Sequence, residues 1–189
     1  MKLKALLGTL LIFAAGTSFS HAQEIVPIET YRLGKKALAG CYLKDVNHVL
    51  EKFEGVWKGT CEIGDCKGFR YEVRIKKYYE KTIGMHIEDG LFLRYRVWDA
   101  QGKEIYSTLD IADDNHIEVV KSLCINDNAA KNCQLSYYGA EGMGMGYLLL
   151  KYRDERTLEL RIVPKEMERN DILIFPNYLL DESVLLTKQ

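Results

Sequence analysis

The sequence predicts an all-β protein with a single folded domain. Apolar and polar residues alternate strictly from Phe69 to Lys76, a period of two that is typical of a strand with one buried face. Similar short segments recur down the chain, separated by turn residues and with hardly any helical pattern between them. This favours an antiparallel sheet with up-and-down connections, which closes into a barrel or bends strongly and thereby protects its edges.

The first 22 residues are typical of a signal peptide. Two lysines precede an apolar segment from Leu6 to Ala15, and Ser20-His21-Ala22 places small residues before Gln23. The apolar segment is shorter than the roughly 20 residues that a membrane-spanning helix needs. We therefore expect residues 1–22 to be removed and the protein to be exported, either to the periplasm or outside the cell.

Length and charge suit one small domain. The chain has 189 residues and a formal net charge of −1, and loss of the signal peptide would remove two lysines and no acidic residue. Residues 23–41 show no clean period, so we expect an extended lead-in followed by a single β domain over residues 42–189. No basic run marks a phosphate-binding surface, and we expect no nucleic-acid partner.

A short helical turn should lead into the first core strand. Four apolar residues follow helical spacing, and Asp45 is a candidate N-cap for them. They are Val46, Val49, Leu50 and Phe53.

Gly55 and Trp57 form the point around which we expect the sheet to be organised. Gly55 can adopt backbone angles that are closed to other residues. Trp57 can bury about 150–250 Å² if its indole N–H finds a partner. The two alternatives for Trp57 are an ordinary core residue and a ring that closes the floor of a barrel.

The remaining predicted strands show alternation or a short apolar run between turn residues. They are Thr82–Ile87, Leu93–Trp98, Glu104–Ile111, His116–Cys124, Cys133–Tyr138, Tyr147–Tyr152, Leu158–Ile162, Ile172–Phe175 and Ser183–Lys188. Asp99–Lys103 and Asp154–Arg156 are predicted turns. The four glycines between Gly139 and Gly146 precede a strand and not a helix, so they indicate a bulged turn and not a phosphate loop.

The chain has five cysteines, all after the predicted signal peptide, and they would meet oxidising conditions after export. Cys61 with Cys66, and Cys124 with Cys133, could each link one hairpin by a disulfide, although spacing does not prove connectivity. Cys41 is left over, either as a free thiol or in an intermolecular bond. It ends a segment that matches a lipoprotein box, but charged residues separate this box from the apolar segment, so we expect no lipid anchor at Cys41.

No arrangement of residues typical of an enzyme is visible. His48, His86 and His116 lack the spacing of metal ligands, and His86 and His116 are expected at the surface. The cysteines lack the tight C-x-x-C pairs of zinc sites, and no serine lies in a nucleophile elbow. We therefore expect no catalysis, no bound metal and no cofactor.

One resemblance adds to this interpretation. The segment Asp45–Phe53 leading into Gly55–Gly59 resembles the start of a family of secreted bacterial lipocalin-like proteins of uncharacterised function. Tyr79–Gly84, Ile105–Leu109 and Leu186–Gln189 agree with the same family, so that the resemblance covers roughly residues 42–189.

The resemblance implies a lipocalin-like barrel whose interior can hold an apolar ligand, and it implies no known reaction. The motif shared with lipocalins themselves is Gly55-x-Trp57 after a helical turn. Lys188 is a candidate for the basic residue that packs over this tryptophan in lipocalins.

The sequence therefore predicts a binding protein for a small apolar or amphipathic molecule. Its candidate ligand-binding residues are Tyr71, Val73, Tyr95, Leu148 and Tyr152. Small barrels often fill their interior with side chains. The alternative function is thus a cell-envelope or extracellular interaction module that has no ligand cavity and uses its surface.

Overall fold

The computed structural model describes residues 23–31, 40–83, 85–111, 120–125, 130–138, 145–164 and 183–189. The strands within this part of the chain are β1 Ile25–Pro27, β2 Tyr42–Lys44, β3 Gly55–Thr60, β4 Arg70–Ile83, β5 His86–Trp98, β6 Glu104–Ser107, β7 Val120–Ile125, β8 Asn132–Tyr138, β9 Met145–Asp154, β10 Thr157–Pro164 and β11 Ser183–Lys188. Three single 3₁₀ turns accompany them, namely η1 Ile28–Thr30, η2 Glu51–Phe53 and η3 Gly64–Cys66.

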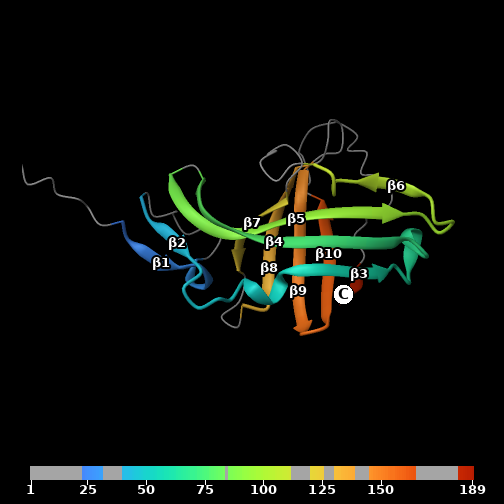
Figure 1. The fold of residues 1–189 in the computed structure, drawn as a ribbon, viewed down its shortest axis with the longest axis horizontal. Helices are drawn as coiled ribbons and strands as arrows, with labels where there is room; N and C mark the ends of the chain where they lie inside the picture. The colour runs from blue at the N-terminus through green and yellow to red at the C-terminus, as the bar shows by residue number, and fades with distance from the viewer. Residues whose placement is uncertain are drawn as a thin grey trace, which may run out of the picture.

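These strands form one sheet, which confirms the predicted β class (Figure 1). The order of its strands is β1-β2-β5-β4-β3-β11-β10-β9-β8-β7, and β6 pairs with the other side of β5. β7 also pairs with β5, through Phe92 with Lys121 and Leu93 with Val120. Over the described residues the sheet bends strongly but is not closed into a barrel.

The prediction of a purely antiparallel sheet is wrong at one end. β1 pairs with β2 in parallel, and β2 pairs with β5 in parallel. The lead-in thus contributes a strand of its own. Both strands are three residues long, which is too short for alternation to predict them.

Several predicted strands have wrong boundaries: β4 runs on to Ile83 and β5 begins at His86, whereas the predicted strands covered Phe69–Lys76 and Leu93–Trp98. Thr82–Ile87 spans the turn between β4 and β5, where Ile83 lies opposite His86. The strand predicted to reach Ile111 ends at Ser107, because the side chain of Thr108 takes over the hydrogen bonding: its Oγ1 accepts from the backbone N–H of Tyr95 at 2.9 Å. The predicted strand Ile172–Phe175, most of the predicted glycine turn and the start of the strand predicted from His116 lie outside the described residues.

The expected helical turn is shorter than its apolar spacing indicated. Only η2 is helical, and it has 3₁₀ geometry. The carboxylate of Asp45 accepts hydrogen bonds from the backbone N–H groups of Val49, at 2.7 Å, and Leu50, at 3.2 Å. Asp45 therefore stabilises a turn as an N-cap would, but the chain enters β3 before a full helix can form.

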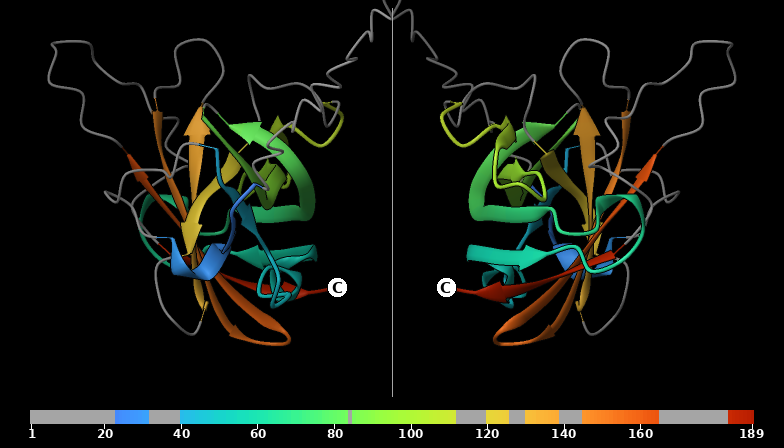
Figure 2. Two further views of the ribbon diagram at one scale, coloured as in Figure 1. Left: turned by 90° about the vertical axis from the view of Figure 1, so that its left-hand side faces the viewer. Right: turned by 90° about the vertical axis from the view of Figure 1, so that its right-hand side faces the viewer.

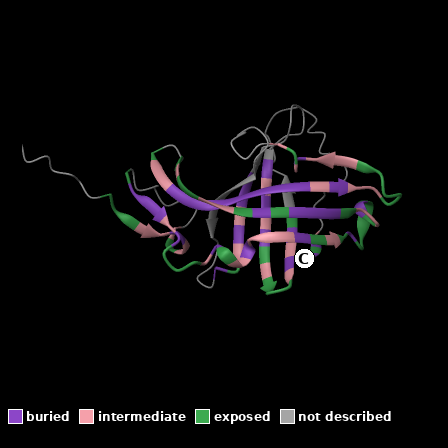
Figure 3. Cartoon of the chain, in the orientation of Figure 1, coloured by how far each residue is buried: buried purple, intermediate pink, exposed green. Residues whose placement is uncertain are grey.

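The core lies between two parts of the bent sheet. β3, β4 and β5 run across β8, β9 and β10 in Figure 1, and the side views of Figure 2 show the two groups facing each other. Apolar side chains from both groups form one buried cluster. In Figure 3 β5 is buried over most of its length. Alternation along the strands directs one set of side chains into this cluster and leaves the other on the outer face.

Trp57 is the largest fully buried side chain, as predicted, with an exposed fraction of 0%. Its indole Nε1–H donates to the backbone oxygen of Phe53 at 2.8 Å. The ammonium nitrogen of Lys188 lies 5.2 Å from the centroid of the Trp57 ring. Gly55, with a φ of 129°, makes room for this contact, since a Cβ atom there would lie 2.8 Å from Cε of Lys188.

Candidate functional site

The outer face of β3, β4 and β5 carries most of the polar side chains of these strands. Because the strands are antiparallel and in register, the outward residues form cross-strand rows. Two such rows are Lys58–Glu72–Arg96 and Thr60–Arg70–Trp98.

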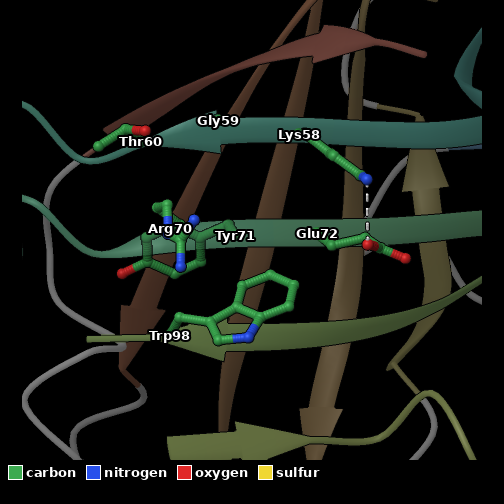
Figure 4. A pocket seen from close by; sticks show the side chains of 7 residues that line it. All are labelled: Lys58, Gly59, Thr60, Arg70, Tyr71, Glu72 and Trp98. Atoms are coloured by element: carbon green, nitrogen blue, oxygen red, sulfur yellow. Dashed lines mark ion pairs between the residues drawn. The ribbon is translucent and has the colours of Figure 1, made fainter. Parts of the chain in front are cut away.

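A groove of about 450 Å³ lies over these rows, and we name it the β3–β5 groove (Figure 4). Its lining residues are Lys58, Gly59, Thr60, Arg70, Tyr71, Glu72 and Trp98. The volume falls within the range of roughly 300–1,000 Å³ that is usual for small-molecule sites. The groove is therefore large enough for a small molecule with up to a few rings.

Trp98 is the one apolar ring that the charged outer face of β5 presents to this groove. It is half-buried, and two guanidinium groups lie close to it. Cζ of Arg70 lies 5.6 Å from the ring centroid and Cζ of Arg96 lies 5.7 Å from it. These cation–π contacts hold the ring in place while leaving part of it exposed.

Glu72 is the acidic residue of the groove, and two cations compensate its charge. Its carboxylate lies 2.7 Å from a terminal nitrogen of Arg74 and 3.4 Å from Nζ of Lys58 (Figure 4). Burial alone would raise the pKa of Glu72, but the hydrogen bonds from Arg74 and Lys58 outweigh it and lower the pKa overall. Glu72 is thus ionised at neutral pH.

Arg70 brings a further positive charge to the groove. Its side chain is exposed, and within the described part of the chain it forms no ion pair with a carboxylate. Since Glu72 is already matched by Lys58 and Arg74, the charge of Arg70 leaves the groove with an excess of positive charge.

The predicted ligand-binding residues lie in the core and not in an open cavity. Val73, Tyr95 and Leu148 are 0%, 4% and 1% exposed and belong to the buried cluster. Tyr152 is half-buried, with its ring centroid 6.0 Å from that of Phe53. Tyr71 is 4% exposed, and it is the member of the predicted set that also lines the β3–β5 groove.

A second, smaller pocket of about 290 Å³ lies over β8, β9 and β10. Its lining residues are Asn132, Cys133, Leu149, Leu150, Lys151, Glu159 and Arg161. It contains no aromatic ring, and Glu159 is already engaged by Arg153, whose Nε donates to it at 2.9 Å. We therefore regard the β3–β5 groove as the better candidate site.

A buried polar junction joins the lead-in to the bent part of β4 and β5. Nζ of Lys77 lies 2.7 Å from the carboxylate of Asp45, and both side chains are almost fully buried. The carboxylate of Asp89 accepts from the hydroxyl of Tyr42 at 2.7 Å and from the backbone N–H of Asp45 at 2.9 Å. All these charges have partners inside the fold, so we assign the junction a structural role.

His86 is not the surface residue that the sequence predicted. Its side chain is 12% exposed, and its Nε2 lies 3.1 Å from the carboxylate of Glu88. Among the described residues, no group of three or more His, Cys, Asp or Glu side chains is placed to hold a metal ion. None of the helical turns in that part of the chain is long and apolar enough to span a membrane.

Of the two predicted disulfides, the one between Cys61 and Cys66 is confirmed. Its S–S distance is 2.01 Å. The side chain of Cys124 lies outside the described residues, so the second predicted disulfide cannot be placed, but the backbone of β7 and β8 sets Cys124 opposite Gln134, the neighbour of Cys133. Cys41 is buried at the start of β2.

Comparisons with models of protein families, with curated proteins and with solved structures find no match to this chain. Its function must therefore be inferred from the geometry of the site.

Tyr71 is the one lining residue that the sequence predicted as ligand-binding, and the missed residues include Lys58, Arg70 and Trp98. A signal for Trp98 was present in the sequence. It continues the alternation on the same face as Arg94 and Arg96, and a large aromatic residue among charged ones marks a surface that can bind a ring.

Proposed function

We propose that the protein is an exported binding protein that holds a small amphipathic molecule in the β3–β5 groove. The observation that carries this proposal is the half-exposed ring of Trp98, which contacts Arg70 and Arg96 and lines a groove of ligand size. A flat apolar part of a ligand would stack on the ring, and its polar part would meet the charged side chains nearby.

Because side chains fill the interior of the fold, a ligand site on the outer face is better supported than one inside. Val73, Tyr95 and Leu148 pack within the buried cluster, and a ligand there would have to displace them. Close-packed interiors resist such insertion. The outer groove needs no rearrangement of the core.

We also propose a lipocalin-like architecture and removal of residues 1–22 on export. Three observations support the first part: Lys188 stacks over Trp57, β11 pairs with β3, and β7 reaches β5. The disulfide between Cys61 and Cys66 is compatible with an oxidising compartment. In this architecture the β3–β5 groove lies on the outside of the barrel.

The test is to produce the full chain in a bacterial host that exports it and to record the mass of the released protein under non-denaturing conditions. We expect a stoichiometric small-molecule adduct that Trp98→Ala loses. Leu185→Ala is the matched control, because Leu185 is an exposed apolar residue on β11, outside the lining of the groove. An adduct that survives Trp98→Ala would contradict this site, and absence of any adduct would favour the surface interaction module.

A further inference from the structure

We infer that the ligand of the β3–β5 groove carries a carboxylate on a flat ring, with the carboxylate at Arg70 and Lys58 and the ring on Trp98. This inference rests on the proposed function and specifies the chemical class of the ligand. It is carried by the charges, the exposure and the stacking geometry of these three residues.

The charges around the groove are unequal. Basic side chains in and beside it are Lys58, Arg70, Arg74 and Arg96, and the acidic ones that pair with them are Glu72, Glu104 and Asp110, the last at 4.0 Å from Arg96. Glu104 pairs with Arg96 at 3.3 Å, and Glu72 pairs with Arg74 and Lys58. The excess positive charge lies at the groove itself and favours an anionic ligand.

Arg70 is the side chain best placed to bind that anion. It lies opposite Trp98 on the neighbouring strand, and its guanidinium group is positioned over the indole ring (Figure 4). A guanidinium group held against a ring keeps its N–H edge available, and that edge matches the two oxygens of a carboxylate.

Lys58 can supply a second donor at little cost. Its side chain is 50% exposed and its distance to Glu72 is 3.4 Å, longer than the 2.7 Å between Arg74 and Glu72. An exposed pair of this kind contributes little stability, so Lys58 can turn to a ligand while Arg74 continues to neutralise Glu72. One excess charge matches a carboxylate better than it matches a phosphate with two charges.

The probes for the experiment are naphthalene-2-carboxylate and its uncharged analogue, naphthalene-2-carboxamide. Both have the same flat ring, and they differ in charge. Calorimetric titration of the mature protein at low salt should give a dissociation constant at least about tenfold lower for the carboxylate, as one charge-assisted hydrogen bond provides. Added salt should reduce this difference, because the groove is open to solvent.

Two variants separate the roles of the side chains. Arg70→Gln should remove most of the preference for the carboxylate while leaving binding of the carboxamide, whereas Trp98→Leu should weaken both probes. Arg153→Gln is the matched control, because Arg153 is an exposed arginine on β9 that lies outside the groove. It should bind both probes like the wild type.

Glu72→Gln gives the sharpest test because its expected effect is a gain. The change removes the negative charge of the groove and frees Lys58, so the carboxylate should bind more tightly, by about twofold to tenfold for an exposed charge pair. A general loss of structure could not produce this result. A cooperative thermal unfolding transition, measured for each variant, will check that the variant is folded.

The outcomes separate this inference from the proposed function. Equal binding of carboxylate and carboxamide, both lost in Trp98→Leu, would overturn the inference and leave the groove as a ligand site. Tighter binding of naphthyl phosphate than of the carboxylate would overturn the choice of anion. If neither naphthalene probe binds in a way that depends on Trp98, both the inference and the groove are wrong.

Discussion

At the scale of single residues, Trp57 is fixed by a short network of contacts. Its ring is fully buried, its N–H donates to Phe53, and Lys188 covers one face. A Trp57→Ala substitution should lower the free energy of unfolding by about 3–5 kcal/mol, because it leaves a large cavity in the core. Urea denaturation measures this loss.

Trp98→Ala is the control for that measurement. Trp98 is half-exposed on the outer face, so its loss should cost much less, about 1 kcal/mol or below. Similar losses for the two tryptophans would contradict the different roles that we assign to them.

Ionisation of the Tyr42 hydroxyl should make the fold less stable at alkaline pH. Burial raises the pKa of Tyr42, and the hydrogen bond to Asp89 and the charge of that carboxylate raise it further. Because the folded protein holds this proton more tightly than the unfolded chain, the stabilisation is complete below the unfolded pKa of about 10 and is lost as the pH rises through the higher folded value.

The measurement is the free energy of unfolding as a function of pH, in the wild type and in Tyr42→Phe. It should fall more steeply above about pH 10 in the wild type, since the variant has no phenol there to ionise. Lys77 contributes a decrease of the same sign in both proteins: burial lowers its pKa, but Asp45 outweighs burial and raises it overall. If the free energy of unfolding falls equally steeply with pH in the two proteins, the folded state does not hold the proton of the Tyr42 hydroxyl more tightly than the unfolded chain does.

At the scale of elements, Gly59 decides how closely β11 can lie against β3. A Cβ atom at Gly59 would be 2.2 Å from the backbone oxygen of Leu185. Gly59→Ala should therefore push the two strands apart and destabilise the protein by about 1–3 kcal/mol, as other overpacked sites do. Hydrogen exchange at the backbone amide of Gln189, which donates to the backbone oxygen of Val56 at 2.9 Å, should become faster when measured by NMR.

Thr60→Ala is the matched control within the same strand. Thr60 is exposed, so the change should alter stability by no more than about 0.5 kcal/mol. If Gly59→Ala proves as mild as Thr60→Ala, the close approach of β11 is not a constraint on the fold.

The elements that the sequence predicted well are those in which one physical signal dominates. The part of β4 up to Lys76 was expected from alternation, which the burial of alternate side chains requires. Thr82–Ile87 was wrong because β-branched residues on both sides of a tight turn produce the same pattern as one continuous strand. β1 and β2 could not be predicted, since pairing with distant segments, and not their own pattern, makes them strands.

At the scale of the whole molecule, the sequence predicted one face of the sheet better than the other. Alternation identified Tyr71, Val73 and Tyr95 as one set, and they do share the buried face. Whether that face encloses a cavity depends on how tightly the two parts of the bent sheet pack, which no local pattern records. The β3–β5 groove arises from cross-strand rows, so its residues meet only once register and bending are known.

The most direct test of the account uses the indole N–H signals of the chain's two tryptophans in an NMR titration. Trp57 lies in the core and Trp98 lies at the groove, and Trp98→Phe assigns the signals. With the co-purified molecule, or with naphthalene-2-carboxylate, the Trp98 signal should shift while the Trp57 signal stays in place. A shift of Trp57 without a shift of Trp98 would place the ligand in the interior and contradict the account.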